Sequence, residues 1–121
     1  MKKILFVLFV LGISLSVHAE LKPKNLVGKW KYEVDTGGQY LTGYFKFVEK
    51  DGKLTGEVVS DDGYDMTFSK IEFKEDNKVH LEAKTDYDVV KVDVKFEGDK
   101  FSGMASNSEG EAPISGKKVN Q

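Results

Sequence analysis

The sequence predicts an all-β protein, an eight-stranded antiparallel up-and-down barrel, with a β-sandwich as the alternative. After residue 25, short runs of Val, Phe, Tyr, Ile and Thr alternate with polar residues, and pairs such as Asp-Gly, Gly-Asp and Asp-Asn separate them. Two of the predicted hairpins have nearly the same pattern. Eight short strands also leave two unpaired edges unless the sheet closes, and a barrel removes both edges.

These turn-forming pairs set the bounds of the predicted strands. Within the predicted fourth strand, Met66 and Phe68 share one parity whereas Ile71 and Phe73 share the other, which predicts a bulge near Ser69. Because every connection is short, strands that are neighbours in sequence should also be neighbours in space. The expected strands lie near residues 28–34, 40–50, 53–59, 64–74, 78–84, 87–97, 100–106 and 111–119.

The pair Asp51-Gly52 predicts a two-residue turn, because both central positions of a type I′ turn need positive φ. Such a turn fixes the register of the hairpin and places Phe47 opposite Gly56. In this register the hydrophobic side chains share one face, and Lys46 meets Glu57 on the other face.

The turn at Gly98-Asp99 predicts a second hairpin of the same design. A shift of 47 residues places Phe47 and Gly56 of the first hairpin on Val94 and Gly103 of the second. The barrel is therefore predicted to consist of two four-stranded repeats, near 28–74 and 75–121.

The N-terminus has the features of a secretory signal peptide. Lys2 and Lys3 precede the apolar run 4–17, and the small residues Val17 and Ala19 flank His18 before a cleavage site. We expect residues 1–19 to be the signal peptide, residues 20–121 to form one domain, and the mature protein to be secreted, either periplasmic or extracellular.

Composition excludes several classes of function. The chain has no cysteine and no arginine, and loss of Lys2 and Lys3 changes its formal net charge from −2 to −4. An acidic chain without guanidinium groups is poorly suited to bind nucleic acid. Charged residues such as Lys29, Glu57 and Lys95 are predicted on the outer face, so no membrane span is expected in the mature chain.

The first predicted strand opens with Gly28-Lys29-Trp30, and the turn of the first predicted hairpin leads into Gly52-Lys53-Leu54-Thr55-Gly56. These segments resemble the motifs of small bacterial secreted lipocalin-like proteins of the calycin group. The resemblance implies a barrel and a small apolar ligand. Larger lipocalins have an arginine near the last strand that packs on the tryptophan, and here only Lys117 or Lys118 is available.

The sequence predicts no enzyme, no cofactor and no metal site. His80 is the single histidine outside the signal peptide, and its parity places it on the outer face. The acidic segment 61–65 lacks the spacing of a calcium loop and is expected to be a solvated turn.

Two candidate sites remain, and they lead to two hypotheses. Trp30, Tyr32, Tyr64 and Met66 should point inward and either line a small-ligand site in or at the mouth of the barrel or fill its core. An outer apolar patch of Tyr44, Val48 and Val59, absent from the second repeat, would instead indicate a protein-interaction module such as an inhibitor or accessory subunit. We expect a non-enzymatic binding protein for a small hydrophobic ligand, with the interaction module as the alternative.

Overall fold

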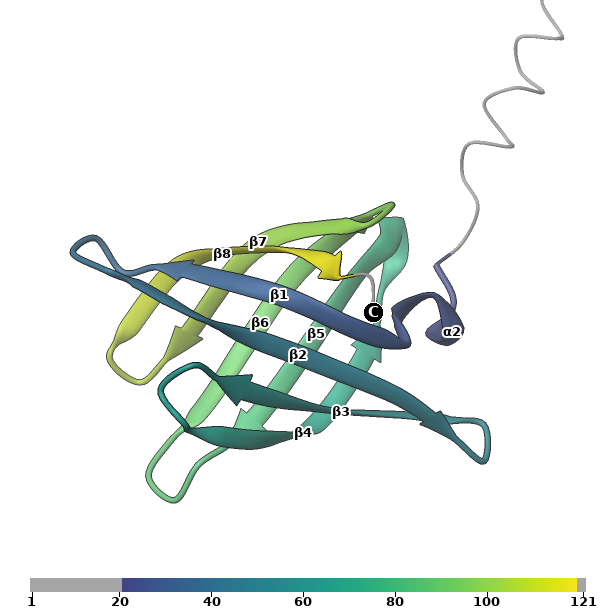
Figure 1. Ribbon diagram of the computed structural model, residues 1–121, viewed down its shortest axis with the longest axis horizontal. Coiled ribbons are helices and arrows are strands. Elements are labelled where there is room, and N and C mark those ends of the chain that lie inside the picture. The colour runs from purple at the N-terminus through teal and green to yellow at the C-terminus, as the bar shows by residue number, and fades with distance from the viewer. Residues whose placement is uncertain (1–20, 120–121) are drawn as a thin grey trace, which may run out of the picture.

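The computed structural model describes residues 21–119, which form a closed barrel in which each strand pairs with the next and the last with the first (Figure 1). This confirms the predicted barrel over the sandwich. The proposed signal peptide lies outside the described residues, in which no helix is long and apolar enough to cross a membrane. The strands are β1 (Gly28–Asp35), β2 (Tyr40–Lys50), β3 (Lys53–Ser60), β4 (Asp65–Phe73), β5 (Lys78–Lys84), β6 (Val89–Glu97), β7 (Lys100–Asn107) and β8 (Gly110–Val119).

The two predicted hairpin registers are confirmed. Asp51 and Gly52 have φ values of 53° and 81°, and Phe47 lies opposite Gly56. A β-carbon on Gly56 would lie only 2.7 Å from the Phe47 ring, so this position requires glycine. In the other hairpin Val94 lies opposite Gly103. This pair lies 47 residues after the pair of Phe47 and Gly56, as the predicted repeat requires.

Several strand boundaries differ from the prediction by one or two residues, and two of these differences move a tyrosine out of a strand. Tyr64 and Tyr87, predicted as strand residues, lie in turns before β4 and β6. Hydrogen bonds close both turns, from the Ser60 N–H to the Tyr64 carbonyl at 3.0 Å and from the Thr85 N–H to the Asp88 carbonyl at 2.8 Å. The predicted bulge is present, since the pairing of β4 with β5 shifts between Phe68 and Lys70.

The two halves of the barrel differ in how their last strands pair. In the second half, β7 and β8 remain paired from Lys100 opposite Lys117 to Asn107 opposite Gly110. In the first half, β3 and β4 pair only where residues 57–59 meet residues 65–67. The neighbouring strands β3 and β4 therefore share a much shorter ladder than β7 and β8.

Aromatic side chains fill the end of the barrel next to α2 (Pro23–Leu26). Trp30 is 1% exposed, and its ring meets the Phe96 ring edge-on at a centroid distance of 4.9 Å. The indole Nε1 donates a hydrogen bond to the Leu26 carbonyl at 2.9 Å, which joins the short helix to the core. The Lys118 ammonium lies 5.6 Å from the Trp30 ring centroid. Lys118 is thus the lysine of the last strand that packs on the tryptophan.

Candidate functional site: a cavity at the open end of the barrel

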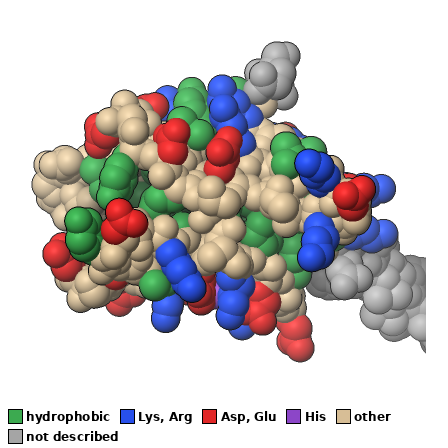
Figure 2. Space-filling model, turned by 90° about the horizontal axis from the view of Figure 1, so that it is seen from below, with side chains coloured by type: hydrophobic (Ala, Val, Ile, Leu, Met, Phe, Trp, Pro, Cys, Tyr) green, Lys and Arg blue, Asp and Glu red, His purple; other side chains and the backbone are tan. Residues whose placement is uncertain are grey.

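The opposite end of the barrel is hollow. Four hairpin loops surround this end, on the left of Figure 1, and together we call them the mouth. Seen from below, hydrophobic and acidic side chains surround a recess at that end (Figure 2). The cavity has a volume of about 720 Å³ and a mostly apolar wall. Its lining includes Tyr32, Val34, Leu41, Phe45, Val58, Met66, Phe68, Ala83, Val90, Val92, Ala105, Ala112 and Ile114.

The cavity exists because small side chains occupy inward positions near the mouth. Ala83, Ala105 and Ala112 come from β5, β7 and β8, and all three line the cavity. At the other end, large rings such as those of Trp30 and Phe96 fill the space and are each only 1% exposed. These alanines are not among the predicted site residues, and the sequence signal that could have found them is their shared inward parity near the same loops.

Three of the four predicted ligand residues line the cavity. Tyr32 lies in its wall and is 7% exposed, Met66 is half-buried, and Tyr64 stands at the mouth with 59% of its surface exposed. Trp30 is not part of the lining. It belongs to the filled end, where it contacts Phe96 and Phe101.

Tyr32 supplies a polar group within this apolar wall. Burial raises the pKa of Tyr32, the neighbouring Ser60 hydroxyl opposes this shift, and the negative charges of Asp61 and Asp62 add to it. The phenol therefore stays neutral at physiological pH and can donate or accept a hydrogen bond. Polar groups of this kind orient ligands in otherwise apolar pockets.

Two carboxylates tie the loops of the mouth together. Asp61 accepts a hydrogen bond of 2.6 Å from the Thr42 hydroxyl, which links the β3–β4 loop to β2. Asp88 accepts one of 2.9 Å from the Ser108 hydroxyl, which links the β5–β6 and β7–β8 loops. The bonds from Ser108 and from the Val89 N–H lower the pKa of Asp88. These contacts give the mouth a defined shape before any ligand arrives.

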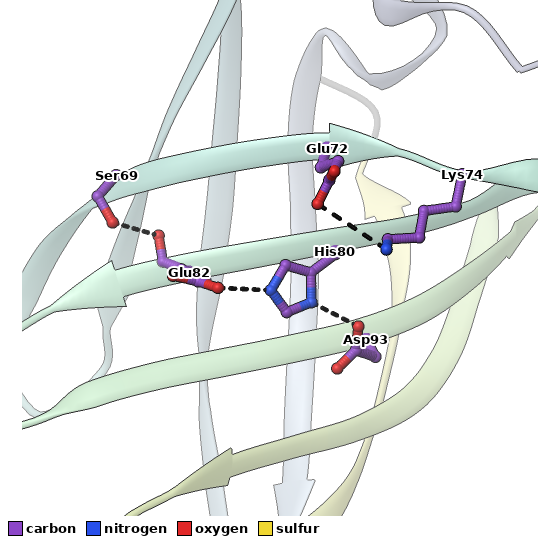
Figure 3. Close-up of polar contacts among 6 residues, drawn as sticks. All are labelled: Ser69, Glu72, Lys74, His80, Glu82 and Asp93. Carbon is purple, nitrogen blue, oxygen red and sulfur yellow. Dashed lines mark hydrogen bonds and ion pairs between the residues drawn. The ribbon is translucent and has the colours of Figure 1, made fainter.

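A polar cluster lies on the outer face of β5 and β6, as predicted for His80 (Figure 3). The His80 Nδ1 lies 2.5 Å from an Asp93 oxygen, and its Nε2 lies 2.7 Å from a Glu82 oxygen. Bonds to Glu82 and Asp93 raise the pKa of His80, and the bond to His80 lowers the pKa of Glu82. With a carboxylate at each ring nitrogen, the charged imidazolium form of His80 is favoured, and its bond to Asp93 joins β5 to β6.

The His80 cluster should make stability depend on pH. A raised pKa in the folded state means that the stabilisation by His80 is complete below pH 6.5 and is lost as pH rises through the folded pKa. The lowered pKa of Glu82 means that its contribution is present above pH 4.5 and is lost as pH falls through the folded pKa. Urea denaturation should therefore show that the cluster contributes most to the free energy of unfolding between pH 4.5 and 6.5.

The control for this prediction is His80→Gln, which should flatten the decline in stability above pH 6.5. In a chain that begins at Glu20, His80 is the single histidine, so its imidazole proton resonances can be followed by NMR without overlap. A titration midpoint at or below 6.5 would contradict the assignment.

The predicted outer patch is assembled on β2 and β3. Tyr44 and Val59 lie directly opposite one another, and Val48 lies farther along β2 with 55% of its surface exposed. The Lys29 ammonium sits 4.2 Å from the Tyr44 ring centroid and covers part of this surface.

A second hollow of about 600 Å³ lies on the outer face of β1, β6, β7 and β8. Lysines from each of these strands line it, and Lys117 has Lys31 and Lys100 as its direct cross-strand neighbours. Like charges at directly opposite positions repel one another. This groove is therefore lined by charged side chains, whereas the cavity at the mouth has a mostly apolar wall.

No family model and no curated protein matches the chain. Solved structures with the same architecture include a redesigned β-barrel, b11L5F_LGL, with a TM-score of 0.65 and 15% identity over 82% of this chain and 95% of that one. The redesigned barrel mFAP1 bound to DFHBI has a TM-score of 0.59 and 16% identity, covering 80% of this chain and 97% of that one. A point mutant of the fluorescent protein UnaG has a TM-score of 0.53 and 15% identity, covering 83% of this chain and all of that one. At these identities, the likeness shows the barrel fold.

Proposed function

We propose that this chain is a secreted, non-enzymatic binding protein with a lipocalin-like barrel that takes a small hydrophobic ligand into its open end. The observation that carries the proposal is the cavity of about 720 Å³ with a mostly apolar wall. Ligand pockets in proteins measure about 300–1,000 Å³ and combine apolar walls with a few polar groups. Here Tyr32 and Ser60 supply such groups in the wall.

The architecture supports this proposal in a second way. A barrel with one filled end and one open end can be stable without its ligand, because Trp30, Phe96 and Phe101 pack against one another at the filled end, away from the open end. The mFAP1 barrel was solved bound to DFHBI, so a barrel of similar fold can hold a small molecule. The interaction-module alternative has less support, because Lys29 partly covers the patch at Tyr44.

Export is part of the proposal and rests on the signal-like segment 1–19. Expression of the full chain in a bacterium, followed by N-terminal sequencing, would test it. A secreted protein beginning at Glu20 supports export, and a cytoplasmic protein beginning at Met1 contradicts it.

The ligand proposal predicts that a neutral alkyl probe binds the chain beginning at Glu20. We expect decan-1-ol to bind saturably with 1:1 stoichiometry in calorimetric titrations and native mass spectrometry, because its chain can enter the apolar cavity. Binding should also raise the melting temperature as the free probe concentration exceeds the Kd. Absence of saturable binding by decan-1-ol and by its charged ten-carbon analogues would contradict the proposed function.

A further inference from the structure

The wall and the rim of the cavity have different chemistry. The wall is apolar, whereas Asp62 and Glu109, which lie in two of the loops of the mouth, contribute to the lining there. No lysine lines the cavity, and the chain has no arginine. The cavity itself indicates a ligand, and the charges at its rim decide which class of ligand it accepts.

The absence of cations extends to all four loops of the mouth. Loops 36–39, 61–64, 85–88 and 108–109 contain five acidic residues and no lysine. The nearest lysines along the chain are Lys84 and Lys91, which alternate with the inward-facing Ala83 and Val90 and therefore lie on the outer face. Glu111 pairs with Ser106, and Ser106 pairs with Lys91, so the side chain of Glu111 shares the outer face with Lys91 and is not a rim group of the cavity.

The rim carboxylates differ in what they contact. Asp61 and Asp88 accept hydrogen bonds from Thr42 and Ser108, so they hold loops in place. Among the described hydrogen bonds and ion pairs, Asp62 and Glu109 receive no bond at their carboxylates. Both remain available to a ligand at the mouth of the cavity.

We propose that the ligand is an amphipathic cation, whose apolar portion occupies the cavity and whose ammonium-type group lies at the rim carboxylates of Asp62 and Glu109. This inference rests on the proposed function and specifies its ligand class. A fatty acid placed the same way would bring its carboxylate to an acidic rim with no cation to pair with it. An amine gains attraction from the same groups.

The test compares three ten-carbon probes that differ only in the head group: decylamine, decan-1-ol and decanoate. Calorimetric titrations at pH 7 and low salt should place decylamine about three- to tenfold tighter than decan-1-ol, a size typical of two exposed charge pairs. Decanoate should bind more weakly than decan-1-ol. Raising the salt to about 0.5 M should narrow these differences, because salt screens exposed charges.

The variant Asp62→Asn/Glu109→Gln removes the two rim charges and should bring the three affinities to within about twofold. The matched control, Glu75→Gln/Asp99→Asn, removes two exposed charges near the filled end and should preserve the order of affinities. If the double rim variant does not fold, Glu109→Gln alone and the salt dependence of the unaltered protein make the same comparison.

The outcomes separate this inference from the proposed function. Equal affinities for the three probes, or tightest binding of decanoate, would overturn the cationic ligand class while leaving a hydrophobic-ligand protein in place. No binding of any probe would overturn both. An amine preference that persists in the rim variant but disappears in the control variant would place the cation elsewhere and also overturn the assignment.

Discussion

Replacing Trp30 by alanine should lower the free energy of unfolding by about 3–5 kcal/mol, the range for removing a large aromatic side chain from a core. Trp30 is 1% exposed and packs against Phe96 and Phe101 at centroid distances of 4.9 and 5.9 Å. The substitution also removes the hydrogen bond to the Leu26 carbonyl, which leaves a buried acceptor without its partner. Urea denaturation followed by far-UV circular dichroism measures the loss, because the chain has no other tryptophan for fluorescence.

Tyr87→Ala is the control for this prediction, since Tyr87 is 93% exposed and its side chain should contribute little. Trp30→Phe should fall between the two variants, because it keeps a ring in the core but loses the indole N–H. If Trp30→Ala unfolded at the same urea concentration as the unaltered protein, with an unchanged m-value, the filled end would not be the main source of stability.

The hairpins could be predicted in detail because short turns determine register. Asp51-Gly52 and Gly98-Asp99 each leave two residues between strands, so every cross-strand pair follows from the turn. Four residues, 85–88, separate β5 from β6, and a loop of that length does not determine a register. The pairing of His80 with Asp93 therefore could not be found from the turn alone.

The cavity was harder to predict than the strands that enclose it. Alternation identifies which residues point inward, but whether they fill the lumen depends on their sizes at each level along the barrel axis. Large rings lie near α2, whereas Ala83, Ala105 and Ala112 lie near the mouth. Tyr32 and Trp30 both point inward and are only two residues apart, yet Tyr32 lines the cavity and Trp30 does not.

The acidic residues at the rim are also far apart in the sequence but close to one cavity in the structure. Asp62 lies in the β3–β4 loop, whereas Glu109 lies in the β7–β8 loop, 47 residues later. That spacing is the repeat period of the two halves, so the duplicated design places an acidic residue at equivalent turns. The period is visible in the sequence, but only closure of the barrel brings both residues to the same cavity.

Ala105→Trp should reduce the affinity for decan-1-ol by more than about tenfold while leaving the protein folded, provided that the probe binds in the cavity. Ala105 lies on β7 between Val92 and Ala112, and all three side chains line the cavity. An indole at this position enters empty space, so it should not impose the cost of about 1–3 kcal/mol expected when a packed core is overfilled. It would occupy volume that the alkyl chain needs.

The matched control for this substitution is Ser102→Trp, which adds the same indole three residues earlier on β7. Ser102 is exposed and lies opposite Lys95 on the outer face, so the control leaves the cavity empty. Calorimetric titration of both variants with decan-1-ol, after thermal unfolding has shown that each is folded, separates binding in the cavity from adsorption to the surface. Equal affinities in the two variants would place the probe outside the barrel, whereas selective loss in Ala105→Trp would place it among the small side chains that keep the open end hollow.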